Sequence, residues 1–161
     1  MATDRLGICL SLEKIAPSQY GNYNFNSFCK FGDRYLGANE DGIFVLGEDD
    51  LDNLVQIEAF FRLLTTDFGL PSQKRIRSVH VGFETDGTLK ITVGTDEENE
   101  VETELVAVNR TNKQHSQKVP IGRDLKGRYW ELEIRNVDGA DFSVDSIIAY
   151  PIILGNKPES P

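Results

Sequence analysis

The chain has 161 residues, of which 39% are hydrophobic and 27% are charged, and its formal net charge is −9. These values predict one folded domain whose core needs no disulfide or metal, and they exclude a disordered chain. The negative charge excludes a general affinity for nucleic acid or for an anionic membrane surface, because both are polyanions. A local basic patch that meets an acidic partner stays open.

The first residues, Met-Ala-Thr-Asp-Arg, lack the basic region and apolar run of a signal peptide. No segment approaches the ~20 apolar residues that span a bilayer. We therefore expect synthesis and folding in a cytoplasm. The two cysteines, Cys9 and Cys29, are expected to be small buried hydrophobic residues, with a disulfide or a reactive thiol as the less favoured alternatives.

The first third of the chain predicts a strand, a loop and a hairpin. Alternation of Leu6, Ile8, Leu10 and Leu12 predicts a half-buried strand over residues 5–15. Residues 17–24 have the composition of a loop. Residues 25–36 and 43–46 are predicted to pair around a turn at 39–42, where Asp-Gly suits the positive φ of tight hairpins. An acidic loop follows at 47–53.

Residues 54–65 fit both a helix and a strand. Leu54, Ile57, Phe61 and Leu64 would line one face of a helix, whereas the apolar residues from Val55 to Leu63 also alternate as in a strand. We favour the strand, because the stretch is short and ends at two threonines without a helix cap.

From residue 75 onward the alternation is clear. It predicts a hairpin whose buried face carries one set of residues on each side of a turn at 85–87: Val79, Val81 and Phe83, then Leu89, Ile91 and Val93. Further strands are predicted at 101–108, at 129–136 and at 142–154, the last with a bend near 147–148. The acidic stretch 95–100 and the polar stretch 109–117 are predicted loops, and Asp138-Gly139 is a predicted turn.

Together these elements predict an all-β protein of about eight or nine strands, arranged as a jelly-roll-like β-sandwich. We expect a single domain over residues 1–154. Residues 155–161 contain two prolines and no core residue, which predicts a flexible C-terminal tail.

No catalytic or cofactor motif is present in the sequence. Neither histidine lies in a recognisable nucleophile–base arrangement, so we expect that the protein is not an enzyme. We expect His80 to be a half-exposed residue of a strand and His115 to be a solvated residue of a loop. Zinc spacings and phosphate-binding glycine motifs are missing, and we predict no cofactor and no metal site. The acidic stretches 48–52 and 138–141 are read as solvated loops, with calcium binding as the alternative.

One basic segment stands out in this acidic chain. Its candidate binding residues are Arg123, Lys126, Arg128, Tyr129 and Trp130, because arginine and aromatic residues are enriched at binding hot spots. The alternative is that Trp130 anchors the core and the basic residues form a solvated turn.

Three parts of the sequence carry a family resemblance. The run Asn-Ser-Phe-Cys-Lys-Phe-Gly-Asp-Arg-Tyr-Leu-Gly-Ala-Asn-Glu-Asp-Gly-Ile-Phe at 26–44 resembles a segment of tailed-bacteriophage virion structural proteins. Thr-Asp-Phe-Gly at 66–69 with Lys-Arg-Ile at 74–76 is similar to the same group. So is Lys-Gly-Arg-Tyr-Trp-Glu-Leu-Glu-Ile-Arg-Asn-Val-Asp-Gly-Ala-Asp-Phe at 126–142, closing with Asp-Ser-Ile at 145–147.

The resemblance implies a non-enzymatic virion subunit, made in the host cytoplasm, that assembles with copies of itself and with other virion proteins. The tail or baseplate is the expected position, and the expected state is a homo-oligomer without a direct nucleic-acid or membrane role. Alternatives are a capsid decoration protein and a carbohydrate-binding module, which would stack sugars on tyrosines such as Tyr20, Tyr23, Tyr35 or Tyr129.

Overall fold

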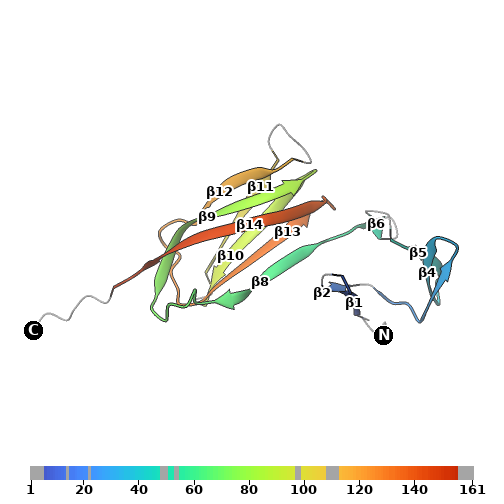
Figure 1. Cartoon of the computed structure of the whole chain (residues 1–161). Helices are drawn as coiled ribbons and strands as arrows, with labels where there is room; N and C mark the ends of the chain where they lie inside the picture. The colour runs from blue at the N-terminus through green and yellow to red at the C-terminus, as the bar shows by residue number, and fades with distance from the viewer. Residues whose placement is uncertain are drawn as a thin grey trace, which may run out of the picture. The chain divides into compact units, whose positions relative to one another are not determined.

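The computed structural model describes residues 6–13, 15–21, 23–47, 51–52, 55–96, 99–107 and 113–155. Its regular structure is entirely β (Figure 1). The described residues form fourteen strands, more than the eight or nine predicted. The sequence predicts one domain over residues 1–154, whereas the chain folds as two compact units, Met1–Asp49 and Asp50–Pro161. We call them the N-terminal unit and the C-terminal unit and describe each by itself.

The N-terminal unit is built from two small antiparallel sheets. The first pairs β1 (Gly7–Ser11) with β2 (Ala16–Tyr20), and the second has the order β3 (Ser27–Phe31), β4 (Arg34–Asn39), β5 (Gly42–Leu46). The predicted loop at 17–24 is therefore wrong for β2, whose backbone pairs with β1 in spite of its turn-rich composition. The predicted strand 25–36 is interrupted at Gly32, which has φ +60° and turns the chain between β3 and β4.

The turn predicted at 39–42 is confirmed. The side-chain oxygen of Asn39 accepts hydrogen bonds from the backbone N–H groups of Asp41 (2.9 Å) and Gly42 (3.2 Å). Asparagine at the first position of a turn commonly makes this contact, so the local sequence is sufficient to form the turn between β4 and β5.

The C-terminal unit contains two larger antiparallel sheets and one short pair. The four-stranded sheet has the order β11 (Glu100–Val106), β10 (Thr88–Thr95), β13 (Trp130–Val137), β8 (Phe60–Thr66). The three-stranded sheet has the order β12 (His115–Pro120), β9 (Lys74–Thr85), β14 (Phe142–Ile153). The short pair is β6 (Leu51–Asp52) with β7 (Val55–Gln56).

The two larger sheets share one hydrophobic core. The two strands predicted on either side of the turn at 85–87 are confirmed as β9 and β10, and their alternating residues are buried in that core, with Phe83 and Ile91 fully inaccessible. The predicted hairpin is wrong, because β9 and β10 belong to different sheets and pair with other strands. Trp130, Leu132 and Ile134 of β13 join them from the same sheet as β10. Period-2 alternation therefore identified the core strands correctly, because one face of each of these sheets is buried.

Other predictions are corrected at element boundaries. For residues 54–65, the strand that we favoured over a helix is confirmed, although it is divided into β7 and β8. The predicted loop 109–117 is wrong for its last three residues, which begin β12, while 108–112 lie outside the described residues. In β14 the register shifts at Val144/Ser146 and at Ala149/Pro151, on either side of the predicted bend. The tail beyond Gly155 also lies outside the described residues.

Candidate functional site

The predicted basic segment is held by buried apolar residues and by backbone pairing. Ile121 and Leu125 are buried in the core, and Gly127 pairs with Lys74 of β9 through backbone hydrogen bonds of 2.9 and 3.1 Å. A Cβ atom at position 127 would lie 2.6 Å from Oδ1 of Asp96 and 2.8 Å from Cβ of Thr95, so this close approach requires glycine. The segment is therefore a fixed part of the C-terminal unit.

Side chains fix the end of this segment as well. Oδ1 of Asp96 accepts hydrogen bonds from the backbone N–H groups of Arg128 (3.0 Å) and Tyr129 (3.2 Å). The ammonium of Lys74, whose side chain is fully buried, donates to the carbonyl oxygen of Arg128 at 2.5 Å. The Arg128 guanidinium lies over the Tyr129 ring, 5.0 Å from its centroid. Arg128 and Tyr129 are thus presented on a rigid backbone.

The structure separates the five predicted binding residues into two groups. Arg123, Lys126, Arg128 and Tyr129 lie at the surface, whereas Trp130 is only 2% exposed and belongs to the core. Its indole N–H donates to the carbonyl oxygen of Gly127 at 3.3 Å. The core-anchor alternative therefore describes Trp130.

An apolar cleft of about 330 Å³ lies between the edge strands β8 and β14. The Trp130 ring, with Val79 and Ile147, forms part of its wall, and Leu64 and Ile148 stand exposed beside it. Leu64 is 91% exposed, which is unusual for a leucine in a strand. The sequence analysis did not predict this cleft. The one available signal was that residues 54–65 place apolar side chains on both faces of a strand.

The three-stranded sheet of the N-terminal unit has two unlike faces. On one face, Phe25 packs against Phe28 and Phe44 with ring centroids 5.9 and 5.7 Å apart, and it also covers Gly37, where a Cβ would lie 2.8 Å from the ring. We call the opposite face the bare face. Its apolar residues are partly buried or exposed: Cys29, Phe31, Leu36, Ala38, Ile43 and Val45. Ser27 and Arg34 lie on the same face at its edge.

The bare face corrects the prediction for the cysteines. Cys29 and also Cys9 of β1 are free and exposed, not buried. The prediction assumed that every strand would bury one face within the subunit. In the N-terminal unit that assumption fails, because its two small sheets leave several apolar side chains uncovered.

The histidines and tyrosines also have defined environments. His80 is half-buried in β9, as predicted, whereas His115 lies in β12 and stacks on Phe83 with ring centroids 5.7 Å apart, so the prediction of a solvated loop residue is wrong. Tyr23 packs among aromatic rings, and the Tyr35 ring is approached by the ammonium of Lys30, 5.4 Å from its centroid.

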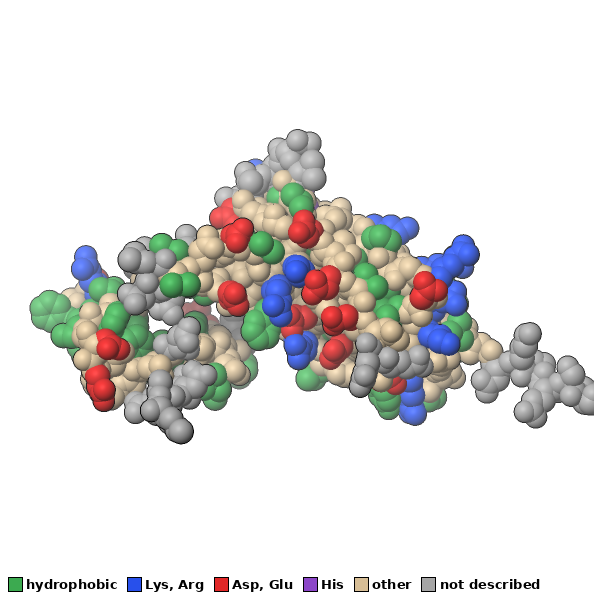
Figure 2. Space-filling view, turned by 180° about the vertical axis from the view of Figure 1, so that it is seen from behind, with side chains coloured by type: hydrophobic (Ala, Val, Ile, Leu, Met, Phe, Trp, Pro, Cys, Tyr) green, Lys and Arg blue, Asp and Glu red, His purple; other side chains and the backbone are tan. Residues whose placement is uncertain are grey.

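Charged residues on the four-stranded sheet form ion pairs and not a metal cluster. Among the described residues, no group of three or more histidine, cysteine, aspartate or glutamate side chains is placed to hold a metal ion. Residues 48–50 and 53 of the acidic loop lie outside the described residues. Acidic and basic side chains are interleaved on the face seen in Figure 2, and Lys90 pairs with Glu102 at 3.2 Å.

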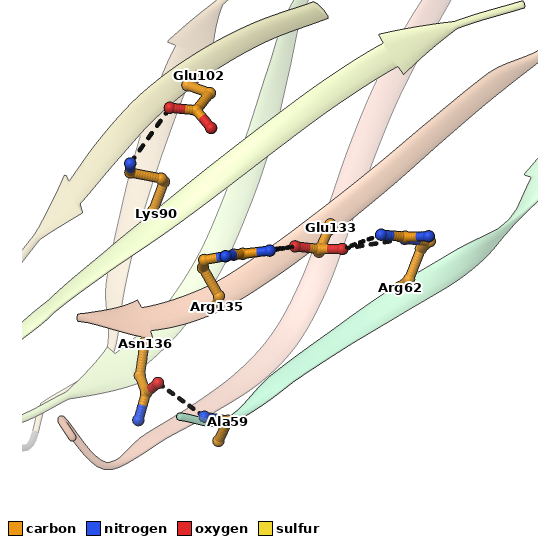
Figure 3. Close-up of polar contacts among 7 residues, drawn as sticks. All are labelled: Ala59, Arg62, Lys90, Glu102, Glu133, Arg135 and Asn136. Carbon is orange, nitrogen blue, oxygen red and sulfur yellow. Dashed lines mark hydrogen bonds and ion pairs between the residues drawn. The ribbon is translucent and has the colours of Figure 1, made fainter. Parts of the chain in front are cut away.

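Glu133 is the buried member of this charge network (Figure 3). One carboxylate oxygen accepts from Arg62 at 2.5 and 3.0 Å, and the other accepts from Arg135. Burial alone would raise the pKa of Glu133, but hydrogen bonds and charge from Arg135 and Arg62 outweigh burial and hold its pKa below the ordinary value. The arrangement stabilises the ionised form of Glu133.

We expect Glu133→Gln to lower the free energy of unfolding by about 1 kcal/mol at pH 7, a value reduced for the solvent around both arginines. Because the pKa of Glu133 is lowered in the folded state, its contribution is complete above the ordinary value near 4.5 and is lost as the pH falls further. Urea unfolding at pH 7 and pH 3 measures the difference. Glu104→Gln, an exposed carboxylate on the same sheet, is the control and should change little.

Comparison of the chain with protein-family models, with curated proteins and with solved structures finds no match. Within the described part of the chain, no helix is long and apolar enough to span a membrane. The candidate surfaces are therefore three: the bare face, the cleft between β8 and β14, and the exposed basic side chains of residues 123–128.

Proposed function

We propose that the chain is a non-enzymatic structural subunit of a tailed-bacteriophage particle, positioned in the tail or baseplate, that binds copies of itself and other virion proteins. The bare face is the observation that carries the proposal. Phe31 and Ile43 are 76% and 75% exposed on it, and an apolar sheet face of this kind marks a surface that a partner covers. β5 reads Gly-Ile-Phe-Val-Leu, a continuous apolar run typical of a strand buried on both faces.

The family resemblance supports the same conclusion, because its first segment, 26–44, contains β3, β4 and most of β5. A virion subunit acts by being covered by its neighbours, so the resemblance and the exposed face agree. The exposed Arg123, Lys126 and Arg128 are proposed to lie at the rim of such contacts, where charges orient acidic neighbours in a salt-dependent manner.

We also propose that the C-terminal unit is a jelly-roll-like β-sandwich. A jelly roll has eight antiparallel strands in two sheets. The orders β11-β10-β13-β8 and β12-β9-β14 are those of a jelly roll that lacks its first strand, the neighbour of the last strand. Many virion proteins use this architecture, and it supports the structural role.

Ile43→Asp should weaken self-assembly and leave the subunit folded. Ile43 is exposed in the subunit, so its replacement removes few internal contacts, but a contact that covers the bare face would have to bury the new carboxylate. Size-exclusion chromatography with light scattering measures the oligomer, and electron microscopy shows whether it is a closed ring. Raising the salt concentration should weaken assembly as the basic rim is screened.

Two controls accompany this variant. Ile43→Val keeps the face apolar and should assemble, and Ser18→Asp adds the same charge to an exposed position of β2 and should also assemble. A wild-type chain that stays monomeric at every concentration and binds glycans would replace the virion proposal with the carbohydrate-binding module. Recovery of the chain on the head surface of assembled particles would replace the tail position with capsid decoration.

A further inference from the structure

The three-stranded sheet of the C-terminal unit ends at β14, which has β9 as its one neighbour among the described strands. The apolar cleft runs between this edge and β8. We propose that strand β1 of a second copy of this chain pairs with the free edge of β14 and places Ile8 and Leu10 in the cleft. The inference rests on the proposed function, since both require self-assembly, and it specifies one contact by which the copies join.

The two long sides of the C-terminal unit are unlike. On one side the side chain of Gln117 in β12 donates to the carbonyl oxygen of Glu104 (3.1 Å) and accepts from the N–H of Val106 (3.4 Å), which joins β12 to β11. On the other side Phe61 of β8 stacks on Phe142 of β14 with centroids 6.3 Å apart. Beyond this ring pair the cleft opens, so only part of the β8–β14 side is closed.

The edge of β14 beside the cleft is suited to strand addition. Residues 146–150 lie between the two register shifts and carry no charge and no proline. Natural edge strands are usually protected by charges, prolines or bulges, and here Asp145 and Pro151 protect only the ends of this stretch. The unprotected five residues can therefore pair with a strand of similar length, and the new strand would occupy the position of the missing first strand of a jelly roll.

Strand β1 has the properties that this position requires. It is five residues long, and β2 is its one neighbour among the described strands, so its other edge can still pair. Tyr23 packs on the face of β1 that carries Gly7, and a Cβ atom at position 7 would lie 2.6 Å from the Tyr23 ring. The opposite face carries Ile8, which is 75% exposed, and Leu10, which is also exposed. That apolar face has no partner among the described residues of the N-terminal unit.

Pairing of β1 with β14 would cover the free edge of β14 and the exposed apolar face of β1 in one contact. An isolated two-stranded hairpin is marginally stable in water, and β1–β2 would become part of a five-stranded sheet with β14, β9 and β12. A small ligand is the weaker occupant, because Thr66 and Glu131 are the only polar residues among those that line the cleft, whereas ligand sites usually converge several polar groups. The contact is head-to-tail, so repetition gives a ring or a filament.

The test uses two full-length variants that fail in complementary ways. Ile8→Asp with Leu10→Asp blocks the donor strand and leaves the cleft intact. Leu64→Asp with Ile148→Asp blocks the cleft at two exposed positions and leaves β1 intact. Each variant alone should associate at least tenfold more weakly than the wild-type chain. An equimolar mixture should regain the association that each variant alone lacks, since one intact donor meets one intact cleft.

Fluorescence provides a second readout, because Trp130 is the only tryptophan of the chain and lies in the wall of the cleft. Its emission should shift in the mixture and stay unchanged in either variant alone. The matched controls are Ser11→Asp on the other face of β1 and Thr65→Asp beside Leu64, and both should assemble as the wild-type chain does. If an aspartate variant does not fold, serine at the same positions is used with the same two outcomes.

The outcomes separate this contact from the proposed function. If the wild-type chain assembles and both variants assemble equally well, β1 does not fill the cleft, and the bare face remains the assembly surface. If the variants dissociate and their mixture does not regain association, strand donation between copies is overturned as well. If the wild-type chain is monomeric at every concentration, both the contact and the self-assembling subunit are overturned.

Discussion

Phe83→Ala should lower the free energy of unfolding of the C-terminal unit by about 4 kcal/mol, because truncation of a large core side chain loses its burial and leaves a cavity. Phe83 is fully inaccessible in β9, between strands β12 and β14. It lies opposite His115 and Val144 in the two pairings, and the His115 ring stacks on it. Contacts on several sides leave little room for the site to collapse.

Urea unfolding followed by Trp130 emission measures this change. The matched control is Phe60→Ala in β8, where the same side chain is mostly exposed and should contribute less than about 1 kcal/mol. A similar loss from both variants would mean that the unit has no single core centred on β9. A loss below about 1 kcal/mol for Phe83→Ala would contradict its position in that core.

Asn136→Ala should cost about 3 kcal/mol, because one buried amide satisfies three backbone groups. Its oxygen accepts from the N–H of Ala59 at 2.8 Å, and its nitrogen donates to the carbonyl oxygens of Ile57 (2.9 Å) and Ala140 (3.1 Å). The side chain thus joins the segment before β8 to the turn after β13. Alanine leaves all three partners without this contact.

Amide hydrogen exchange gives a local readout for this variant. The N–H of Ala59 should exchange faster in Asn136→Ala than in the wild-type chain, in addition to the fall in global stability. Asn39→Ala is the control, because Asn39 makes the comparable contacts of an exposed turn and should change global stability by less than about 1 kcal/mol. Unchanged exchange at Ala59 would show that Asn136 does not hold the segment before β8.

The proposed assembly surfaces were largely invisible in the sequence. Ile43 and Val45 have the same apolar character as the core residues of β9, and only the absence of a covering layer in the subunit distinguishes them. The basic residues 123–128 were recognised, but the burial of Trp130 beside them depends on β13 packing against the three-stranded sheet. No local pattern reports which apolar side chains are covered by the same subunit.

The alternation of residues 79–93 was sufficient to predict strands β9 and β10 and their buried faces, because the side chains of a strand alternate with period 2. It did not reveal that these two strands lie in different sheets and do not pair with each other. Strands β2 and β12 could not be predicted in this way, since their polar, turn-rich sequences become strands only by pairing with β1 and β9. Burial of Glu133 likewise required Arg62, which is 71 residues away. Backbone pairing and burial between distant segments are long-range properties, and composition within a short window does not contain them.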